Sequence, residues 1–261
     1  MRVTVVIPAL NEAGNIGRLV EETYAAVPAD MLAEVIVVDD ASTDETTSIE
    51  SIIENLVVVR NESNLGFLKS VNRAATFARG EFLYLLNNDT EVRSLFLDEV
   101  LAPFADATIG MTGSKLLNLD GTIQEAGGVV WGSGQPWNLG RNQPACSAEW
   151  NYARDVDYIS GAAMCVRRSL WEKLGGFSVE FAPAYYEDTD FAFKVRAEGL
   201  RTLYMPTSEV VHFEGKSNGR DVTKGVKRYQ VVNETTFRRK WIHTFRTGGA
   251  EGVDVHLAKD R

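Results

Sequence analysis

Short apolar runs alternate with amphipathic segments through the first 105 residues of the chain. Four continuous apolar runs, of the kind that form strands buried on both faces, lie at residues 3–7, 35–38, 56–59 and 82–86. Apolar side chains recur at helical spacing over 16–27 and 67–78, and Gly80 is expected to end the second of these helices. Thr43, followed by two acids, marks the start of another helix. The alternation predicts a parallel sheet with helices on both faces.

The pattern becomes less regular after about residue 105. Apolar segments at 109–117 and 122–130 flank the turn sequence Asn-Leu-Asp-Gly at 118–121, and 131–150 is predicted to be a loop that carries Gly, Trp and Asn. Three further strands are predicted at 158–167, 203–205 and 209–213, and three helices at 169–174, 191–197 and 226–242. This half is therefore expected to add mixed structure to the regular first half.

Composition places the chain among ordinary globular proteins. Of its 261 residues 44% are apolar and 24% are charged, and no apolar run reaches the roughly 18 residues of a membrane-spanning helix. The N-terminal segment is expected to be the first buried strand and not a signal peptide. Cys146 and Cys165 lack CxxC spacing, which excludes a zinc site or a disulfide framework and favours a reducing, cytoplasmic location.

The net charge of −9 argues against a general nucleic-acid partner, which would require a basic footprint. Basic residues nevertheless gather near the C-terminal helix, at Lys224, Lys227, Arg228, Arg238, Arg239, Lys240 and Arg246. Two interpretations of this helix stay open. It either contacts anionic lipid headgroups peripherally, at the inner face of a membrane, or is a solvated amphipathic helix.

Polar residues follow three of the four predicted strands. They are Pro8, Ala9, Asn11 and Glu12 after the first strand, Asp39 and Asp40 after the second, and Asn87, Asn88 and Asp89 after the fourth. In open α/β sheets ligands bind beyond the carboxyl ends of the strands, so these residues predict a binding site at one edge of the sheet. For Asn11, capping of the first helix is an equally good interpretation.

The chemistry of these acids points to a nucleotide. The adjacent carboxylates of Asp39 and Asp40 lose hydration at the mouth of a buried strand and need hydrogen-bond donors, which a uracil or thymine imide and a ribose would supply. Asp89 suits a hard divalent cation on a diphosphate, although Asn-Asn-Asp is also a common turn. Neither GxGxxG nor GxxxxGK[ST] is present, which disfavours an NAD enzyme or a P-loop kinase.

These segments, together with Asn-Leu-Gly-Phe at 64–67, Tyr-Glu-Asp-Thr-Asp at 186–190 and His212, resemble glycosyltransferase family 2 over residues 3–241. The resemblance is strongest to bacterial rhamnosyltransferase-like members that build O-antigens and other surface polysaccharides. It implies the GT-A fold, a Rossmann-like, mostly parallel central sheet with helices on both faces and a smaller mixed acceptor-side region. One domain is then expected at 1–246, with a nucleotide-binding half (1–105), an acceptor and catalytic half (106–246), and a tail at 247–261.

The resemblance also implies residue roles. Asp40, helped by Asp39, contacts base and ribose, Asp188 beside Glu187 is the catalytic base, and Asp89 with His212 holds Mn²⁺ or Mg²⁺. Other implied contacts to the nucleotide sugar are Pro8, Ala9, Asn11, Glu12, Asn64, Gly66, Lys69, Asn87, Asn88, Lys216 and Ser217. Lys216 and Ser217 are expected in a loop that orders over the diphosphate. Asn87 replaces the first acid of the family's DXD motif, which weakens the expected metal site.

The resemblance thus implies an inverting transfer of a sugar from a UDP or dTDP donor to a hydroxyl of a glycan or lipid-linked acceptor. One alternative is a non-catalytic nucleotide-sugar-binding module, which Asn87 favours. A sugar nucleotidyltransferase is another, but it would need a Gly-rich loop after the first strand. The acids at 187–190 are also typical of a helix N-terminus. Trp131, Trp137 and Trp150 are equally compatible with stacking on an acceptor sugar and with packing.

Overall fold

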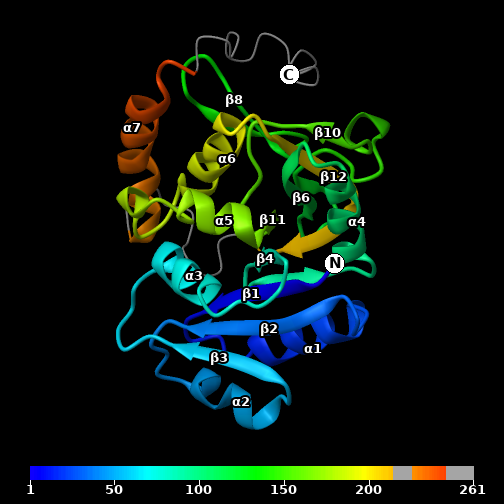
Figure 1. Ribbon diagram of the computed structural model, residues 1–261, viewed down its shortest axis with the longest axis vertical. Coiled ribbons are helices and arrows are strands. Elements are labelled where there is room, and N and C mark those ends of the chain that lie inside the picture. The colour runs from blue at the N-terminus through cyan, green and yellow to red at the C-terminus, as the bar shows by residue number, and fades with distance from the viewer. Residues whose placement is uncertain (214–224, 245–261) are drawn as a thin grey trace.

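The computed structural model describes residues 1–213 and 225–244. A single twisted sheet runs through both halves of the chain, in the order β10-β12-β6-β11-β4-β1-β2-β3, with β5 paired to β12 and β7 to β6 (Figure 1). Its first-half strands are β1 (Val3–Ala9), β2 (Leu32–Asp39), β3 (Leu56–Arg60) and β4 (Phe82–Leu86), which pair in parallel as predicted. The carboxyl ends of β1, β2 and β4 therefore open onto one edge of the sheet.

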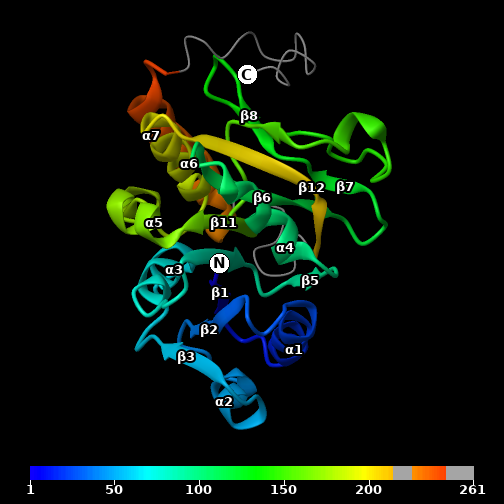
Figure 2. The same ribbon diagram turned by 45° about the vertical axis from the view of Figure 1, so that its right-hand side comes forward.

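Helices cover both faces of these strands, because alternate strand residues point to opposite sides. Val5 and Ile7 belong to the core beneath α1 (Ile16–Ala26), whereas Val6 belongs to the core beneath α3 (Phe67–Ala75). Every one of these strand residues is fully buried, which explains the continuous apolar runs. Figure 2 shows α1 and α3 on the two sides of the β1–β2 layer.

Two details of the first half differ from the prediction. The helix α3 ends at Ala75 and is not capped by Gly80, whose N–H instead donates to Thr4 Oγ1 at 2.9 Å. A Cβ on Gly80 would lie 2.5 Å from the Thr4 backbone nitrogen, so glycine is needed for this close approach. The helix predicted to start at Thr43 is capped by Asp44, and consists of a 3-10 turn (Glu45–Ser48) followed by the short α2 (Ile49–Ile52).

The second half adds antiparallel pairs to the sheet together with one parallel pair, β6 with β12. Its strands are β6 (Ile109–Leu117), β7 (Ile123–Glu125), β10 (Arg154–Asp155), β11 (Ala163–Arg167) and β12 (Arg201–His212). The two strands predicted at 203–205 and 209–213 are one strand, whose pairing with β6 is irregular between Met205 and Glu209. The strand predicted from residue 158 begins only at Ala163, because the preceding residues form the wall of a cleft.

The remaining corrections concern short elements. Gly127, at φ +77°, divides the predicted strand at 122–130 into β7 and β8 (Gly128–Val130). The predicted loop 131–150 contains β9 (Pro136–Asn138), which pairs with β8, and a 3-10 turn at Ala148–Trp150. Among the elements that were not predicted are β5 (Thr90–Val92), α4 (Phe96–Leu101) and β10. All three are too short to carry a readable period.

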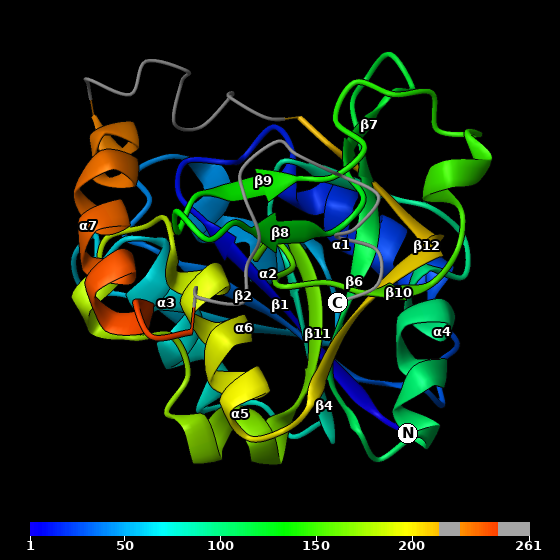
Figure 3. The same ribbon diagram turned by 90° about the horizontal axis from the view of Figure 1, so that it is seen from above.

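Three helices complete the second half. They are α5 (Arg168–Leu174), α6 (Glu187–Ala197) and α7 (Tyr229–Trp241), the last preceded by a 3-10 turn at Val226–Arg228. Figure 3 shows α7 standing at the outer edge of the molecule beside α6, where Phe193 packs against Phe237 and Trp241. Within residues 1–213 and 225–244, no helix has the length and apolarity to cross a bilayer.

Candidate active site

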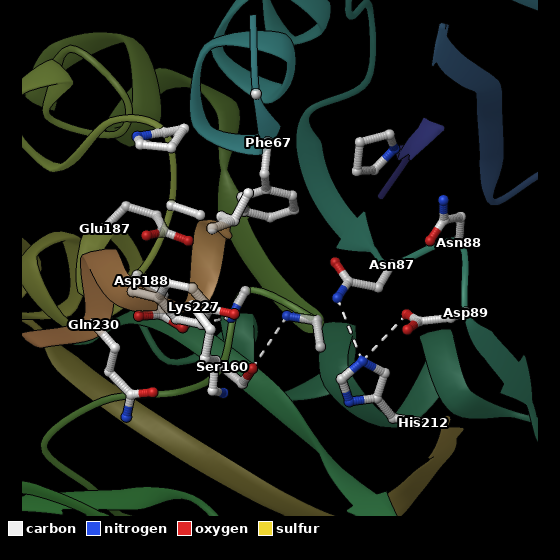
Figure 4. A pocket seen from close by; sticks show the side chains of 18 of the residues that line it. Phe67, Asn87, Asn88, Asp89, Ser160, Glu187, Asp188, His212, Lys227 and Gln230 are labelled. Atoms are coloured by element: carbon white, nitrogen blue, oxygen red, sulfur yellow. Dashed lines mark hydrogen bonds and ion pairs between the residues drawn. The ribbon is translucent and has the colours of Figure 1, made fainter. Parts of the chain in front are cut away.

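A cleft of about 990 Å³ lies at the carboxyl ends of β1 and β4, between two walls of different origin (Figure 4). The first, here called the strand-end wall, consists of Pro8, Ala9, Leu10, Asn11, Glu12, Asp40, Asn64, Gly66, Phe67, Ser70, Asn87, Asn88 and Asp89. The second, here called the loop wall, includes Gln124, Glu125, Pro136, Trp137, Asn138, Ser160, Gly161, Pro183, Tyr185, Tyr186, Glu187, Asp188, His212, Lys227 and Gln230. The cleft thus gathers most of the predicted site residues, from six separate segments.

Two predicted residues lie outside the cleft lining. Asp39 is buried, accepts a hydrogen bond from the Ser42 N–H at 2.9 Å and lies 3.5 Å from the Arg60 guanidinium. Lys69 is an exposed residue of α3. The predicted contacts at Lys216 and Ser217 lie outside the described residues.

Asp40 is held rigidly by the chain itself. Its Oδ1 accepts hydrogen bonds from the Asn61 amide and from the Leu65 N–H, both at 2.7 Å, and its Oδ2 accepts one from the Gly66 N–H at 2.9 Å. These contacts fix the turn at 64–66 against the end of β2. Asn61 was not predicted as a site residue, because nothing in the sequence pairs it with a residue 21 positions away.

Asn11 joins two loops of the strand-end wall. Its side-chain oxygen accepts a hydrogen bond from the Thr43 N–H at 2.8 Å, and its own N–H donates to Ser42 Oγ at 2.9 Å. The residue that precedes α1 is Asn15, so the capping interpretation of Asn11 was wrong. The backbone of Asn11 is left-handed, with φ 56°, a conformation that Asn tolerates better than most residues. This geometry binds the β1 and β2 ends into one surface.

Asp89 and His212 meet at the floor of the cleft. His212 Nε2 lies 3.2 Å from Asp89 Oδ1 and 3.4 Å from the Asn87 amide nitrogen (Figure 4). The two residues come from the end of β12 and the turn after β4, which β5 brings together by pairing Thr90 with His212. Asn87 Oδ1 is buried and has no hydrogen bond among the described residues, so it is available to a ligand.

This donor set fits a divalent cation only if the ligand contributes to it. A carboxylate oxygen and an imidazole nitrogen are both suitable ligands for Mn²⁺. Within the described residues no cluster of three or more His, Cys, Asp or Glu side chains is placed to hold a metal. Asp89 and His212 would therefore need oxygens of a bound diphosphate to complete the coordination.

Glu187 and Asp188 lie across the cleft from Asp89 and His212, at the first turn of α6 (Figure 4). Asp188 accepts hydrogen bonds from the Gly161 N–H at 3.0 Å and the Thr189 N–H at 2.6 Å. Burial raises the pKa of Asp188 above its usual range, in spite of these hydrogen bonds. A carboxylate with a raised pKa, held rigidly and facing a cleft, is suited to accept a proton.

Glu187 is more deeply buried than its neighbour. Its pKa is raised well above the usual value, first by burial and then by the negative charge of Asp188. The Oε2 atom of Glu187 has no hydrogen bond among the described residues. The acids of this segment do stand at a helix N-terminus, as one interpretation expected, and Glu187 and Asp188 also line the cleft.

The loop that leads into α6 is strained and clamped. Tyr185 and Tyr186 have left-handed backbones, with φ of 76° and 70°, a conformation that costs about 1–3 kcal/mol for such residues. The buried side chain of Asn233 on α7 donates to the carbonyls of Phe181, Ala184 and Tyr185, at 2.7, 3.0 and 3.0 Å. These hydrogen bonds, here called the α7 clamp, could not be predicted, since Asn233 lies within a basic helix.

The three tryptophans divide between the two interpretations. Trp131 and Trp150 are 2% and 5% exposed and belong to the core. Trp137 is 42% exposed, lines the cleft and packs edge-on against Trp131 with ring centroids 5.6 Å apart. Only Trp137 is therefore placed to stack on a ligand.

The fold and the cleft define a class of protein. The mixed sheet with helices on both faces matches the GT-A fold of glycosyltransferases. A solved structure of GalNAc-T7 with UDP, GalNAc and Mn²⁺ matches 92% of this chain and 48% of its own, with a TM-score of 0.74 at 21% sequence identity. At that identity the likeness shows the fold alone.

The sequence profile of Glycosyl transferase family 2 matches residues 4–170, and that of Glycosyl transferase family group 2 matches residues 146–255. The chain belongs to glycosyltransferase family 2.

Curated relatives agree with this assignment. The O-antigen biosynthesis protein RfbC of Myxococcus xanthus is 27% identical over 84% of this chain and 18% of the relative. The N-acetylglucosaminyl-diphospho-decaprenol L-rhamnosyltransferase of Mycobacterium tuberculosis is 25% identical over 72% of this chain and 68% of the relative. The chain spans only 24% and 18% of the length of the first two curated relatives it matches.

Proposed function

We propose that the chain transfers a sugar, with inversion, from a nucleoside diphosphate sugar to an acceptor hydroxyl in the synthesis of a surface polysaccharide. The observation that carries the proposal is the opposition of Asp188 to the Asp89–His212 pair across one cleft (Figure 4). An inverting displacement needs a base on one side of the anomeric carbon and charge stabilisation on the other.

The strand-end wall is proposed to bind the nucleotide. Asp40 Oδ1 accepts two hydrogen bonds and Oδ2 accepts one from the described residues, so Oδ2 keeps capacity for another donor. The imide N–H of uracil or thymine would supply it, in keeping with a UDP or dTDP donor. The UDP in the GalNAc-T7 structure supports the first of these donor types.

Asp89 and His212 are proposed to hold Mn²⁺ or Mg²⁺ together with the diphosphate. The cation would supply positive charge to the leaving nucleoside diphosphate. Mn²⁺ in the GalNAc-T7 structure supports this assignment. Asn87 stands where the family has an acid, and its unpartnered Oδ1 is proposed to accept a hydrogen bond from the donor sugar or ribose.

Asp188 is proposed to act as the base. As the acceptor oxygen forms its bond to the anomeric carbon, the bond from that carbon to the diphosphate breaks, and the hydroxyl proton passes to Asp188. The raised pKa makes Asp188 a stronger base than an exposed carboxylate, provided that the pH keeps it ionised. Glu187, next to it, is proposed to hold the acceptor.

The acceptor is proposed to be a glycan or a lipid-linked sugar, bound along the loop wall by Trp137, Tyr185 and Gln230. The two surface-glycan relatives support this class of acceptor. Val231 and Val232 on α7 are 57% and 56% exposed among basic residues. Peripheral contact of this helix with anionic lipid at the cytoplasmic face of a membrane stays a prediction.

Calorimetric titration with UDP, dTDP, GDP and their sugars, with and without Mn²⁺, tests the proposal. We expect tight binding of one uracil or thymine nucleotide only when the metal is present. Asp89→Ala should remove the metal dependence. The control is Asp120→Ala, at an exposed turn residue outside the cleft lining, and it should leave the metal dependence intact. The absence of binding by every nucleotide would contradict the proposal.

A further inference from the structure

Gln124 is a buried polar residue, only 3% exposed, at the centre of β7. It lies 88 positions before His212 in the sequence. The two residues nevertheless meet, because β6 pairs with β7 on one side and with β12 on the other. A buried amide in a short strand needs partners for both its donor and its acceptor.

The orientation of the Gln124 amide follows from its neighbours. The Ile123 carbonyl, which can only accept, receives a hydrogen bond from the Asn118 amide nitrogen at 3.3 Å. This leaves Asn118 Oδ1 as an acceptor for Gln124 Nε2, also at 3.3 Å. Gln124 Nε2 donates in addition to the His212 carbonyl at 3.2 Å. With its nitrogen so occupied, Gln124 presents its oxygen to the imidazole.

The Gln124 oxygen determines which ring nitrogen of His212 carries the proton. Gln124 Oε1 lies 2.7 Å from His212 Nδ1, and an amide oxygen can only accept, so the proton of the neutral imidazole resides on Nδ1. The lone pair of Nε2 then lies 3.4 Å from the Asn87 amide nitrogen, which can donate to it, and 3.2 Å from Asp89 Oδ1. Nε2 and Asp89 Oδ1 are both electron-pair donors in this tautomer, so a cation placed between them would relieve their repulsion.

We propose that Gln124 is a positioning residue, which fixes His212 in its Nδ1–H tautomer and so aims Nε2 and Asp89 at a common cation. The inference rests on the proposed function for the identity of that cation. Residues that hydrogen-bond to the far nitrogen of a metal-binding histidine change metal affinity by about 10–100-fold when they are lost. Gln124 touches neither nucleotide nor acceptor in this scheme and acts through His212 alone.

The tautomer is measured first, in the metal-free chain. Long-range ¹H–¹⁵N correlation spectra distinguish the two tautomers, and the chain has three histidines, so His212 is assigned by the signals lost in His212→Asn. We expect Nδ1–H in the wild type and in Gln124→Glu, which keeps an acceptor, but a mixture of tautomers in Gln124→Leu. A wild-type His212 with its proton on Nε2 would overturn the proposal, whatever the variants do.

Mn²⁺ affinity is measured next, by electron paramagnetic resonance with UDP or dTDP present. We expect affinity to fall about 10–100-fold in Gln124→Leu and to hold within a few fold in Gln124→Glu. The exposed Gln143→Leu, in the loop after β9, serves as the control. Unchanged Mn²⁺ affinity or an unchanged tautomer in Gln124→Leu would overturn the proposal. A wild type that shows Nδ1–H yet binds no Mn²⁺ would instead contradict the metal site of the proposed function.

Discussion

The two walls of the cleft are built in different ways. The strand-end wall consists of short turns that follow parallel strands, and neighbours in space there are also close in strand order. The loop wall is assembled from β7, β9, the loop before α6, the end of β12 and α7, which lie far apart in the sequence. Turns at the ends of neighbouring parallel strands therefore form the first wall, whereas contacts between distant elements, such as that of Asn233, form the second.

Removal of Asp40 should have the largest effect on stability. Asp40→Ala removes the acceptor of three hydrogen bonds, which come from Asn61, Leu65 and Gly66, and is expected to cost about 2–4 kcal/mol. Nucleotide binding should be lost with it. Urea unfolding measures the change, with Asp44→Ala as the control, because that half-buried N-cap should cost only about 1 kcal/mol. Equal costs for the two variants would contradict a special role of Asp40 in the wall.

Loss of the Asn233 hydrogen bonds should affect the loop wall and leave the strand-end wall intact. Asn233→Leu removes three hydrogen bonds to the strained loop and should cost about 1–3 kcal/mol. Sugar transfer should fall strongly because Asp188 loses its position, while nucleotide affinity stays the same. Thr235→Leu, at an exposed site of the same helix, should change neither quantity. A fall in nucleotide affinity that matches the fall in the transfer rate would contradict the independence of the two walls.

Gly66 lies where the walls meet. Its φ is +79°, and a Cβ there would lie 2.8 Å from Pro183 Cβ, at the start of the strained loop. Gly66→Ala is therefore expected to cost about 1–2 kcal/mol in thermal unfolding. Gly14→Ala is the matched control, since a Cβ at Gly14 meets nothing within 4 Å. A Gly66→Ala chain as stable as the Gly14→Ala control would contradict a close contact between the two walls at Gly66 and Pro183.

Glu187→Gln should have the smallest effect, and of the opposite sign. The folded-state pKa of Glu187 is raised, so its charged form destabilises the fold above that pKa, and this penalty disappears as the pH falls. Replacement by Gln should stabilise the chain by about 1 kcal/mol at pH 8 and by less at pH 5. Thermal unfolding of the wild type and of Glu187→Gln at pH 8 and pH 5 measures this gain in stability. A larger gain at pH 5 would mean that Glu187 is stabilising when ionised.

The difference between the walls also explains what the sequence could predict. Continuous apolar runs such as Val35–Val38 define strands, and the polar residues that follow, including Asp40 and Asp89, are then placed by topology. No such rule places Gln124 beside His212 or Asn233 beside Tyr185, because each contact depends on the packing of distant elements. The one sequence feature that points to the first of these contacts is the adjacent polar pair Gln124–Glu125, which interrupts the apolar segment at 122–130.

Asp188 is the proposed base of the sugar transfer, and its replacement is the sharpest test of the proposed function. The measurement is the initial rate of nucleoside diphosphate release from the donor that binds best, with Mn²⁺, for the wild type and for Asp188→Asn. We expect a rate about 10²–10⁴-fold lower in the variant, with donor affinity unchanged. The wild-type rate should also fall in acid, at a pH above the usual carboxyl range, because Asp188 must be ionised. An Asp188→Asn chain that turns over its donor at the wild-type rate would show that Asp188 is not the base.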